Sequence, residues 1–273
     1  MLNITIQRLY CMYSFMKKHI FAIFTLFFLS NSSFASQTEV TFVTEHLPPY
    51  QIIKEDSSVV GFATEVVLEA AQRAKINYSL YLYPWVRTYN LALTKTNHCI
   101  FSLARLPSRE KLFAWIGPVT EKNNAVIWSL KSNKHGKEIK TVDDLKRYTT
   151  AVNKNDATHT GMLNIGLTEN ENLYVLEYTD SLINLLVDRP EIDFIVADDI
   201  SIPHRAKLSG VSVDLLQRVI EVKSLPLNFF LACNVDTDRN IIEKLTISLA
   251  NIHQDGTYQK IFSKWKSKMP HLK

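Results

Sequence analysis

The sequence is short of cysteine, of enzyme signature motifs and of long hydrophobic runs, and each shortage excludes a class of protein. Of its three cysteines, only Cys99 and Cys233 follow residue 35, and they are too far apart to suggest a metal site. No GxSxG, HExxH or phosphate-binding loop motif occurs, which argues against hydrolase and nucleotide chemistry. The apolar run from Ile20 to Leu29 is too short to span a bilayer as a helix.

The first 35 residues have the composition of an export signal. They contain Arg8, Lys17 and Lys18 but no acidic residue, and the apolar run is followed by Ser33-Phe34-Ala35. A basic start, a short apolar core and small residues at the end predict a signal peptide over residues 1–35, cleaved after Ala35. A retained anchor is the alternative, and Met16 is an alternative start. The expected location is the periplasm.

Removal of this leader changes the charge balance and leaves two cysteines. The leader accounts for three of the 31 basic residues, so 28 basic residues remain against 27 acidic ones. Without a basic stripe, no nucleic-acid partner is expected. The remaining 238 residues are enough for one large core or two smaller ones. Disulfides form in exported proteins, so Cys99 and Cys233 are either bridged or two buried thiols.

Alternating strand and helix patterns predict an α/β protein. Residues 39–44, 77–83 and 99–104 have the β-branched or apolar character of strands, while 62–74 and 85–93 carry apolar residues at helical spacing. This order predicts a largely parallel sheet covered by helices. A strand at 125–130 and a polar connection at 132–137 follow.

A second α/β series begins at Thr141, where a threonine with Asp144 three residues later predicts a helix start. Strands are predicted at 149–152, 173–177 and 194–197, with helices near 158–167 and 181–186. A strand at 228–232 and helices at 238–252 and 257–265 close the chain. Two lobes are therefore expected, with residues 36–130 in lobe 1, 131–225 in lobe 2, and 226–273 returning to lobe 1. Strand ends of such lobes line a ligand cleft.

Arg109 is the first candidate binding residue. It follows a predicted strand and Pro107-Ser108, with Trp115 close by in the sequence. A guanidinium holds a carboxylate by two parallel charge-assisted hydrogen bonds and keeps its charge when partly buried. A solvated loop arginine is the alternative interpretation.

The chain after the leader contains a series of short segments in a characteristic order: Pro48-Pro49-Tyr50, Gly61-Phe62-x-x-Glu65-Val66, Trp85, the Arg109 segment with Trp115, Asp193-x-x-x-x-Asp198, and Asp255-Gly256-Thr257-Tyr258-x-x-Ile261-x-x-x-Trp265. In this order they resemble the family-3 extracellular solute-binding proteins, the polar amino-acid class of bilobal periplasmic binding proteins. The resemblance spans nearly the whole chain after the leader. It implies a type II binding-protein fold, with two α/β lobes joined by a two-strand hinge.

The resemblance assigns roles to residues on both lobes. Arg109 is expected to hold the α-carboxylate of a ligand, and Asp198 its α-ammonium group. The alternative for Asp198 is a capping role at the start of the helix that follows it, which Asp199 could also fill. Tyr50 is expected to stack on the ligand, and Trp85 to line the cleft or belong to the core. Thr158 is expected to contact the ligand at a helix N-terminus.

Glu65 and Arg105 complete the candidate set. Glu65 either faces the cleft or only favours the dipole of its own helix. Amino-acid binders of the family generally have threonine where this chain has Leu106. Arg105 either compensates for that hydroxyl or indicates a ligand with more negative charge than an ordinary amino acid.

The function expected from the resemblance is capture of a small zwitterionic or anionic solute by hinge closure, without chemistry or cofactor. A monomer is expected to present the solute to a membrane permease of an ABC transporter, or to a sensor receptor. A dehydratase-type enzyme that uses Glu65 or Asp198 as general acid is the alternative, but no motif specifies the raised pKa that this role requires.

Overall fold

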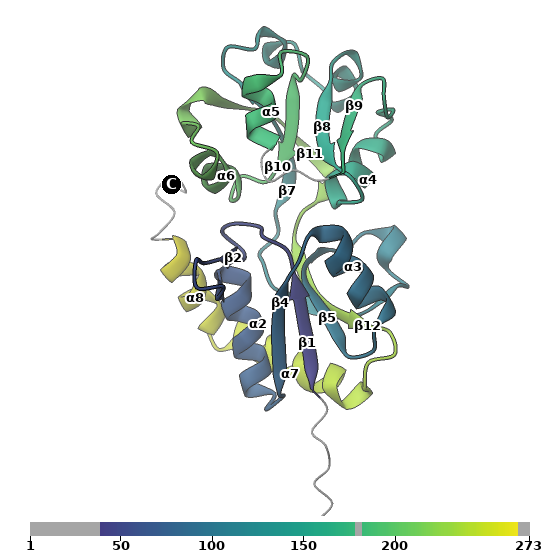
Figure 1. The fold of residues 1–273 in the computed structure, drawn as a ribbon, viewed down its shortest axis with the longest axis vertical. Coiled ribbons are helices and arrows are strands. Elements are labelled where there is room, and N and C mark those ends of the chain that lie inside the picture. The colour runs from purple at the N-terminus through teal and green to yellow at the C-terminus, as the bar shows by residue number, and fades with distance from the viewer. Residues whose placement is uncertain (1–38, 178–181, 267–273) are drawn as a thin grey trace, which may run out of the picture. The chain divides into compact units, whose positions relative to one another are not determined.

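The computed structural model describes residues 39–177 and 182–266, which form two α/β lobes, each with its own five-stranded sheet (Figure 1). The predicted signal peptide of residues 1–35 lies outside the described residues.

The first sheet has the strand order β4-β1-β5-β12-β6. β1 pairs in parallel with β4 and β5, whereas β12 runs antiparallel to β5 and β6. A small hairpin of β2 and β3 stands apart from this sheet. The strands are β1 (Val40–Thr44), β2 (Ile52–Ile53), β3 (Val59–Val60), β4 (Tyr78–Leu82), β5 (His98–Ala104), β6 (Phe113–Pro118) and β12 (Phe229–Asn234).

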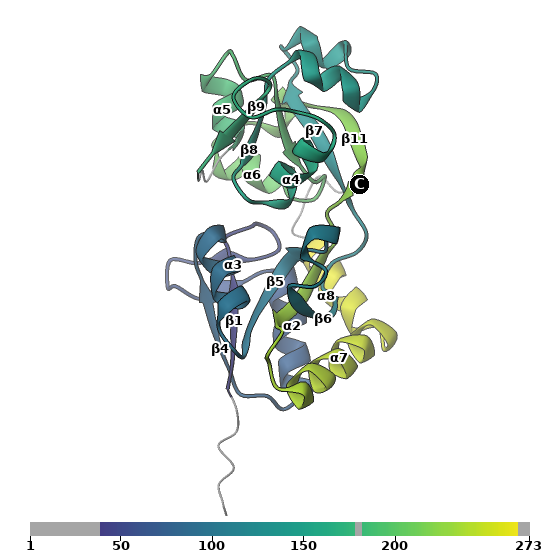
Figure 2. The same ribbon diagram turned by 90° about the vertical axis from the view of Figure 1, so that its right-hand side faces the viewer.

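Helices cover both faces of the first sheet (Figures 1 and 2). On β1, Phe42 packs with α2, α7 and α8, while its neighbour Val43 packs on the opposite face with α3. Burial on both faces explains why its strands read as apolar runs. The helices are α2 (Phe62–Arg73), α3 (Trp85–Thr94), α7 (Arg239–Gln254), α8 (Thr257–Lys266) and the 3-10 helix η1 (Pro107–Arg109).

The second sheet has the order β11-β7-β10-β8-β9, with β8 parallel to both β9 and β10. α5 and α6 cover one face, and α4 the other. The elements are β7 (Asn124–Leu130), β8 (Thr150–Asn153), β9 (Leu173–Leu176), β10 (Phe194–Ala197), β11 (Leu216–Pro226), α4 (Ala157–Asn164), α5 (Leu182–Asp188), α6 (Ile202–Leu208), and the 3-10 helices η2 (Lys134–Lys137), η3 (Val142–Arg147) and η4 (Val213–Leu215).

Two adjacent segments join the lobes. The first leads from β6 to β7 through residues 119–123, and the second from β11 to β12 through 227–228. They are tied together where Leu227 N donates to Asn123 O at 2.8 Å and Phe229 N donates to Thr120 Oγ1 at 2.8 Å. The predicted boundary after residue 130 is wrong, because β7 pairs with β10 and β11 in the second sheet.

Other sequence predictions also differ from the structure, and β6 had no predicted counterpart. The helix predicted near 158–167 ends at Asn164, because Gly166 takes a left-handed conformation with φ 90° that terminates it. The whole of β11 was missed. β11 is an edge strand, and its exposed positions include the charged residues Arg218 and Lys223, which are common on sheet edges. Because these charges interrupt the apolar alternation, the sequence did not indicate a strand.

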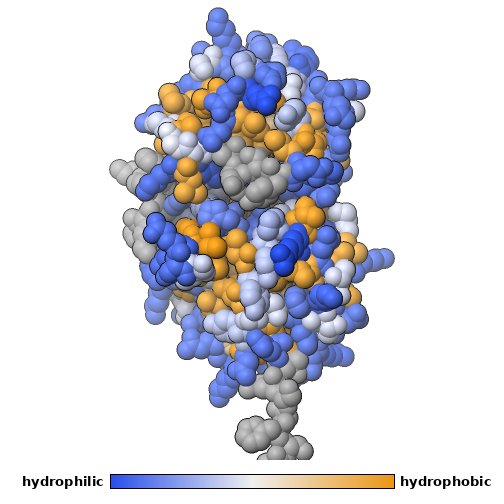
Figure 3. Space-filling view, viewed as in Figure 1, coloured by the Kyte–Doolittle hydropathy of each residue, from blue (hydrophilic) through white to orange (hydrophobic). Residues whose placement is uncertain are grey.

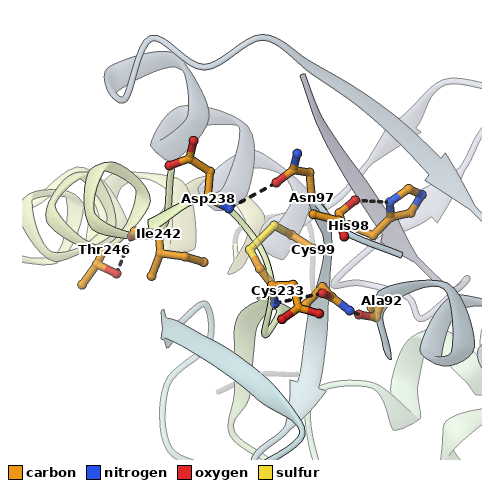
Figure 4. The surroundings of a disulfide bond; sticks show 11 residues. Ala92, Asn97, His98, Cys99, Cys233, Asp238, Ile242 and Thr246 are labelled. Carbon is orange, nitrogen blue, oxygen red and sulfur yellow. Dashed lines mark hydrogen bonds between the residues drawn. A yellow bond between two sulfur atoms is a disulfide. The ribbon is translucent and has the colours of Figure 1, made fainter. Parts of the chain in front are cut away.

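A disulfide joins Cys99 of β5 to Cys233 of β12, where the two residues lie directly opposite each other (Figure 4). Both cysteines are fully buried. Close by, Asp238 N donates to Asn97 Oδ1 at 3.3 Å, which connects the start of α7 to the turn before β5. The bridge therefore ties the strand that re-enters the first lobe to the centre of its sheet.

Gly61 permits the close approach that begins α2. The carbonyl of Tyr50 accepts hydrogen bonds from Ala63 N (3.0 Å) and Thr64 N (3.3 Å), and so satisfies free amides of the first turn. Gly61 has φ 139°, and a Cβ on it would lie 2.6 Å from the carbonyl carbon of Tyr50 and 2.7 Å from Gln51 Cα. Backbone atoms cannot give way as a flexible side chain can.

We therefore expect Gly61→Ala to lower the free energy of unfolding by about 2–4 kcal/mol, the sum of backbone strain and overpacking. Gly256→Ala is a matched control, since Gly256 also has a positive φ of 80° but its Cβ would meet nothing within 4 Å. Urea denaturation of both variants measures the difference. Equal destabilisation of the two would contradict the steric explanation.

The described residues contain no helix long and apolar enough to cross a membrane. On the face drawn in Figure 3, hydrophilic residues surround smaller groups of hydrophobic ones.

Candidate functional site

A cavity of about 270 Å³ is lined by residues from both lobes. Several of them directly follow a strand, as expected for α/β sheets: Glu45 follows β1, Lys154 follows β8 and Asp198 follows β10. Trp85, Leu208, Leu227 and Phe229 supply apolar surface. The charged lining residues are Glu45, Arg109, Lys154, Asp156, Glu177, Asp198 and Arg205.

Arg109 stands at this cavity on η1, with a side chain that is only 5 % exposed. Its guanidinium donates to the carbonyls of Ala104 and Asn155, both at 3.3 Å, and lies 5.3 Å from the ring centres of Trp85 and Tyr89. Among the described residues no carboxylate forms an ion pair with it. Burial lowers the pKa of Arg109, and Tyr89, Asp156 and Glu45 oppose that shift.

Asn155 links the two lobes at this point. Its carbonyl accepts from Trp85 Nε1 at 2.9 Å as well as from Arg109. The residue has φ 62°, a left-handed conformation that asparagine tolerates better than most residues, and it directly precedes the Asp156 cap of α4. Arg109 and Trp85 therefore meet the N-terminus of α4.

Thr158 and Asp156 form that N-terminus. Asp156 Oδ1 accepts from His159 N and from the Thr158 hydroxyl, both at 2.7 Å. Thr158 lines the cavity, as predicted, but its hydroxyl proton is already donated to Asp156. The oxygen of that hydroxyl can still accept a hydrogen bond.

A bulge in β5 shapes the floor of the cavity. Phe230 of β12 pairs with Leu103 and Ala232 with Ile100, so β5 contains one extra residue between these pairs. Ser102 lies there with φ 59° and lines the cavity, while its hydroxyl donates to Gln51 Oε1 at 2.8 Å. Bulges redirect side chains in this way beside functional sites.

Asp198 lines the cavity and also stabilises the turn that leads into α6. Its Oδ1 accepts from Ile200 N and Ser201 N at 2.9 Å, and its Oδ2 accepts from Ser201 Oγ at 2.6 Å. Asp199, the other candidate for this cap, pairs with Arg218 at 3.0 Å instead. The two interpretations of Asp198 are therefore compatible.

Tyr50 does not line the cavity, in contrast to its predicted stacking role. Its side chain is 1 % exposed, packs edge-on against Phe229, and donates its hydroxyl to Asp198 Oδ1 at 2.8 Å. Burial, followed by the charge of Asp198, raises the pKa of Tyr50 well above its usual range. Tyr50 therefore holds Asp198 from the first lobe.

Glu65 and Arg105 also lie outside the cavity lining, which corrects their predicted place in the site. Glu65 faces outward from α2 and pairs with Lys264 of α8 at 2.9 Å. Arg105 pairs with Glu110 and covers the ring of Trp115 at 5.1 Å. Each of the two side chains forms an ion pair with an oppositely charged residue at the surface. These ion pairs direct the side chains away from the cavity, where their motif positions predicted them.

Glu45, Asp156 and Arg205 were missed by sequence reasoning. Glu45 directly follows the predicted strand at 39–44, and Asp156 comes four residues after the predicted strand at 149–152. Because strand ends line the cleft in this architecture, both residues could have been predicted as lining residues. Arg205 lies within α6, seven residues after Asp198, and no short motif marks it. Only the packing of α6 brings it to the cavity.

Glu45 has a pKa raised to about 7. Burial is the largest cause, and the neighbouring Asp156 adds to it, while Arg205 and Arg109 act in the opposite direction. The pKa of Asp156 is also raised, mainly by burial. Near neutral pH, the Glu45 carboxyl is therefore protonated in part of the molecules and ionised in the rest.

The raised pKa predicts a pH-dependent stability. Between its ordinary pKa of 4.5 and about 7, folded Glu45 holds a proton that the unfolded chain has lost. The free energy of unfolding therefore falls as pH rises through this window, by about 1–3 kcal/mol from this group. Glu45→Gln should remove this component, as urea denaturation from pH 4.5 to 8 would show. Glu55→Gln, on an exposed turn, should keep it, and identical pH profiles for wild type and Glu45→Gln would contradict the assignment.

No group of three or more His, Cys, Asp or Glu within the described part of the chain could hold a metal ion. The arrangement suits binding, because one cavity is lined by the buried Arg109 guanidinium of the first lobe and by the hydrogen-bonded Asp198 carboxylate of the second, together with the aromatic rings of Trp85 and Phe229. A zwitterion has the complementary pair of charges.

Comparisons with known proteins agree with this architecture. Residues 40–268 match the family model of the bacterial extracellular solute-binding proteins, family 3. The chain is 25 % identical over 252 residues to ABC transporter arginine-binding protein 1 of Escherichia coli (strain K12), covering 92 % of this chain and 99 % of that protein.

Two solved structures illustrate the similarity of fold. A histidine kinase sensor domain with similarity to periplasmic binding proteins has a TM-score of 0.73 at 14 % identity, covering 84 % of this chain and 96 % of that one. The arginine-, lysine-, histidine-binding protein ArtJ from Geobacillus stearothermophilus has a TM-score of 0.69 at 18 % identity, covering 86 % and 98 %. At these identities the likeness concerns the fold.

Proposed function

The chain belongs to the bacterial extracellular solute-binding proteins of family 3, and we propose that it captures a small zwitterionic or anionic solute, an amino acid or a related compound. The observation that carries the proposal is the Arg109 guanidinium, buried at the cavity without a carboxylate partner among the described residues. A buried charge that lacks a partner in the protein is stabilised when a ligand supplies it.

The proposed mechanism is hinge closure. Arg109 belongs to the first lobe and Asp198 to the second, and two short segments connect these lobes. A solute with a carboxylate at Arg109 and an ammonium group at Asp198 Oδ2 contacts both lobes at once. Only a ligand that binds one arrangement better than another shifts the equilibrium between them, and a solute that bridges the lobes meets this condition.

An ABC transporter is the proposed destination of the solute. The Escherichia coli relative is an arginine-binding protein of such a transporter, and it aligns along nearly its whole length. The sensor-domain structure favours a second candidate, in which the bound form signals to a membrane receptor. Both roles use the same binding step.

We place the protein outside the cytoplasm, in the periplasm. The family is extracellular by its description, and a disulfide between Cys99 and Cys233 suits an oxidising compartment. Binding without chemistry is the expected activity of a member of this family. The dehydratase alternative relied on Glu65 or Asp198 as a proton carrier. Glu65 pairs with Lys264 away from the cavity, whereas Asp198 does line it.

The proposal is tested by native mass spectrometry of protein gently purified from the periplasmic fraction, followed by thermal unfolding with a panel of amino acids and organic acids. A ligand at 100 times its Kd stabilises the folded state by about 2.7 kcal/mol. For a chain of this size we expect the Tm to rise by about 5–10 °C. Absence of both a co-purified small molecule and any shift across the panel would contradict the proposal.

A further inference from the structure

A second arginine reaches the same cavity from the opposite lobe. Arg205 lies on α6, and Leu208, one helical turn later, lines the cavity with it. Among the described residues, no hydrogen bond or ion pair involves the Arg205 side chain. α6 follows β10 and α4 follows β8, and these strands are neighbours, so both helices begin at the same edge of the second sheet.

None of the second-lobe carboxylates that line the cavity forms an ion pair with Arg205, and each has other hydrogen-bond or ion-pair partners. Asp198 accepts from two backbone amides, Ser201, Tyr50 and Asn123. Asp156 caps α4, and Glu177 pairs with Lys154. The charge of Arg205 is therefore available to a ligand.

Arg109 and Arg205 act on the same part of the cavity. Both guanidiniums favour the ionised forms of Glu45 and of Asp156, which places both within electrostatic reach of the same two carboxyls. Glu45 forms no ion pair with either of them among the described residues. One cavity therefore receives two unpaired guanidiniums, one from each lobe.

We propose that Arg205 binds a second acidic group of the ligand, so that the solute is an amino acid with a carboxylate side chain. This inference rests on the proposed function, in which Arg109 holds the α-carboxylate. A guanidinium matches a carboxylate by two parallel hydrogen bonds, and two such groups suit a ligand with a carboxylate at each end. A guanidinium or ammonium side chain would instead place a further cation beside Arg205.

The size of the cavity agrees with such a ligand. Its volume of about 270 Å³ is close to the lower end of the range of roughly 300–1,000 Å³ that small-molecule sites have. Aspartate and glutamate have about nine or ten non-hydrogen atoms, within the range of ligands for which a few well-placed polar groups decide specificity. The specificity of this chain would thus differ from that named for its arginine-binding relative.

The test is isothermal titration calorimetry with L-glutamate, L-aspartate, L-glutamine and L-arginine, on wild type, Arg205→Gln and Arg205→Lys. Each protein is expressed with its leader, purified from the periplasmic fraction and freed of bound solute by unfolding and refolding. Lys207→Gln is the matched control, since Lys207 is an exposed cation on the same helix and does not line the cavity. Circular dichroism verifies that every variant is folded.

We expect wild type to bind glutamate or aspartate at least about 10-fold more tightly than glutamine, and Arg205→Gln to lose about 10- to 100-fold in affinity for the acidic amino acid. Its affinity for glutamine should change less than about threefold, and Arg205→Lys should keep part of the preference for the acid. Lys207→Gln should behave as wild type.

Other outcomes overturn the inference. If glutamine or arginine binds wild type as tightly as both acidic amino acids, or if Arg205→Gln weakens all ligands equally, Arg205 does not select an acidic side chain, while the proposed solute binding stands. If wild type binds none of the four, and the wider panel is also without effect, the proposed function fails together with this inference.

Discussion

Arg109→Ala is expected to weaken binding of the solute by roughly 30- to 5,000-fold, the equivalent of about 2–5 kcal/mol for truncating one member of a buried charged pair. The side chain is 5 % exposed, touches two carbonyls and has two aromatic rings within 5.3 Å. Its position is thus set before the ligand arrives, so little conformational entropy is lost when a carboxylate binds.

Calorimetry or thermal shift with the solute identified by native mass spectrometry measures this effect. Arg105→Ala removes an arginine four residues away that pairs with Glu110 at the surface, so its affinity should equal that of wild type. Far-ultraviolet circular dichroism must show that Arg109→Ala remains folded. A folded Arg109→Ala protein with unchanged affinity would exclude the guanidinium as the anion site.

Replacing both Cys99 and Cys233 by serine is expected to lower the free energy of unfolding by about 3–5 kcal/mol. The bridge joins residues 134 positions apart, so it restricts a large loop of the unfolded chain. On the chain-entropy account, long loops yield the largest stabilisation, near 5 kcal/mol for this separation. Every strand and helix of the second lobe, from β7 to β11, lies inside this loop, so the bridge also restricts that part of the unfolded chain.

Urea denaturation of the double variant, compared with wild type with and without a reductant, measures this loss. The reduced wild type should approach the stability of the variant. Ligand affinity should persist in the folded variant, because neither cysteine lines the cavity. A double variant as stable as the oxidised protein would show that the bridge does not restrain the unfolded state.

The strand and helix series was largely predictable, since local periodicity carries it. β1, α2, β5 and α7 lie close to their predicted ranges because each buries a regular apolar face or run. β11 was not predictable in this way, because its charged residues on a sheet edge obscure the alternation. The lobe assignment of β7 depends on its pairing with β10 and β11, and pairing is a long-range property.

The candidate site was predictable in part. The positions of the motifs predicted four binding residues that do line the cavity, namely Arg109, Asp198, Trp85 and Thr158. The same reasoning failed for Tyr50, whose hydroxyl turns to Asp198 and not to the cavity. Surface ion pairs set the directions of Glu65 and Arg105, and the packing of α6 sets that of Arg205. A short sequence motif does not specify these contacts.

The sequence by itself determined the α/β class, the export signal as a prediction, the family resemblance and Arg109 as the first candidate binding residue. These properties follow from composition, periodicity and short motifs, which are local. Only the tertiary structure decided that Cys99 and Cys233 are bridged, that Glu45 titrates near neutral pH, and that Arg205 joins Arg109 at one cavity. Each depends on which distant residues meet and how much water they exclude, and both are consequences of the packing of the chain.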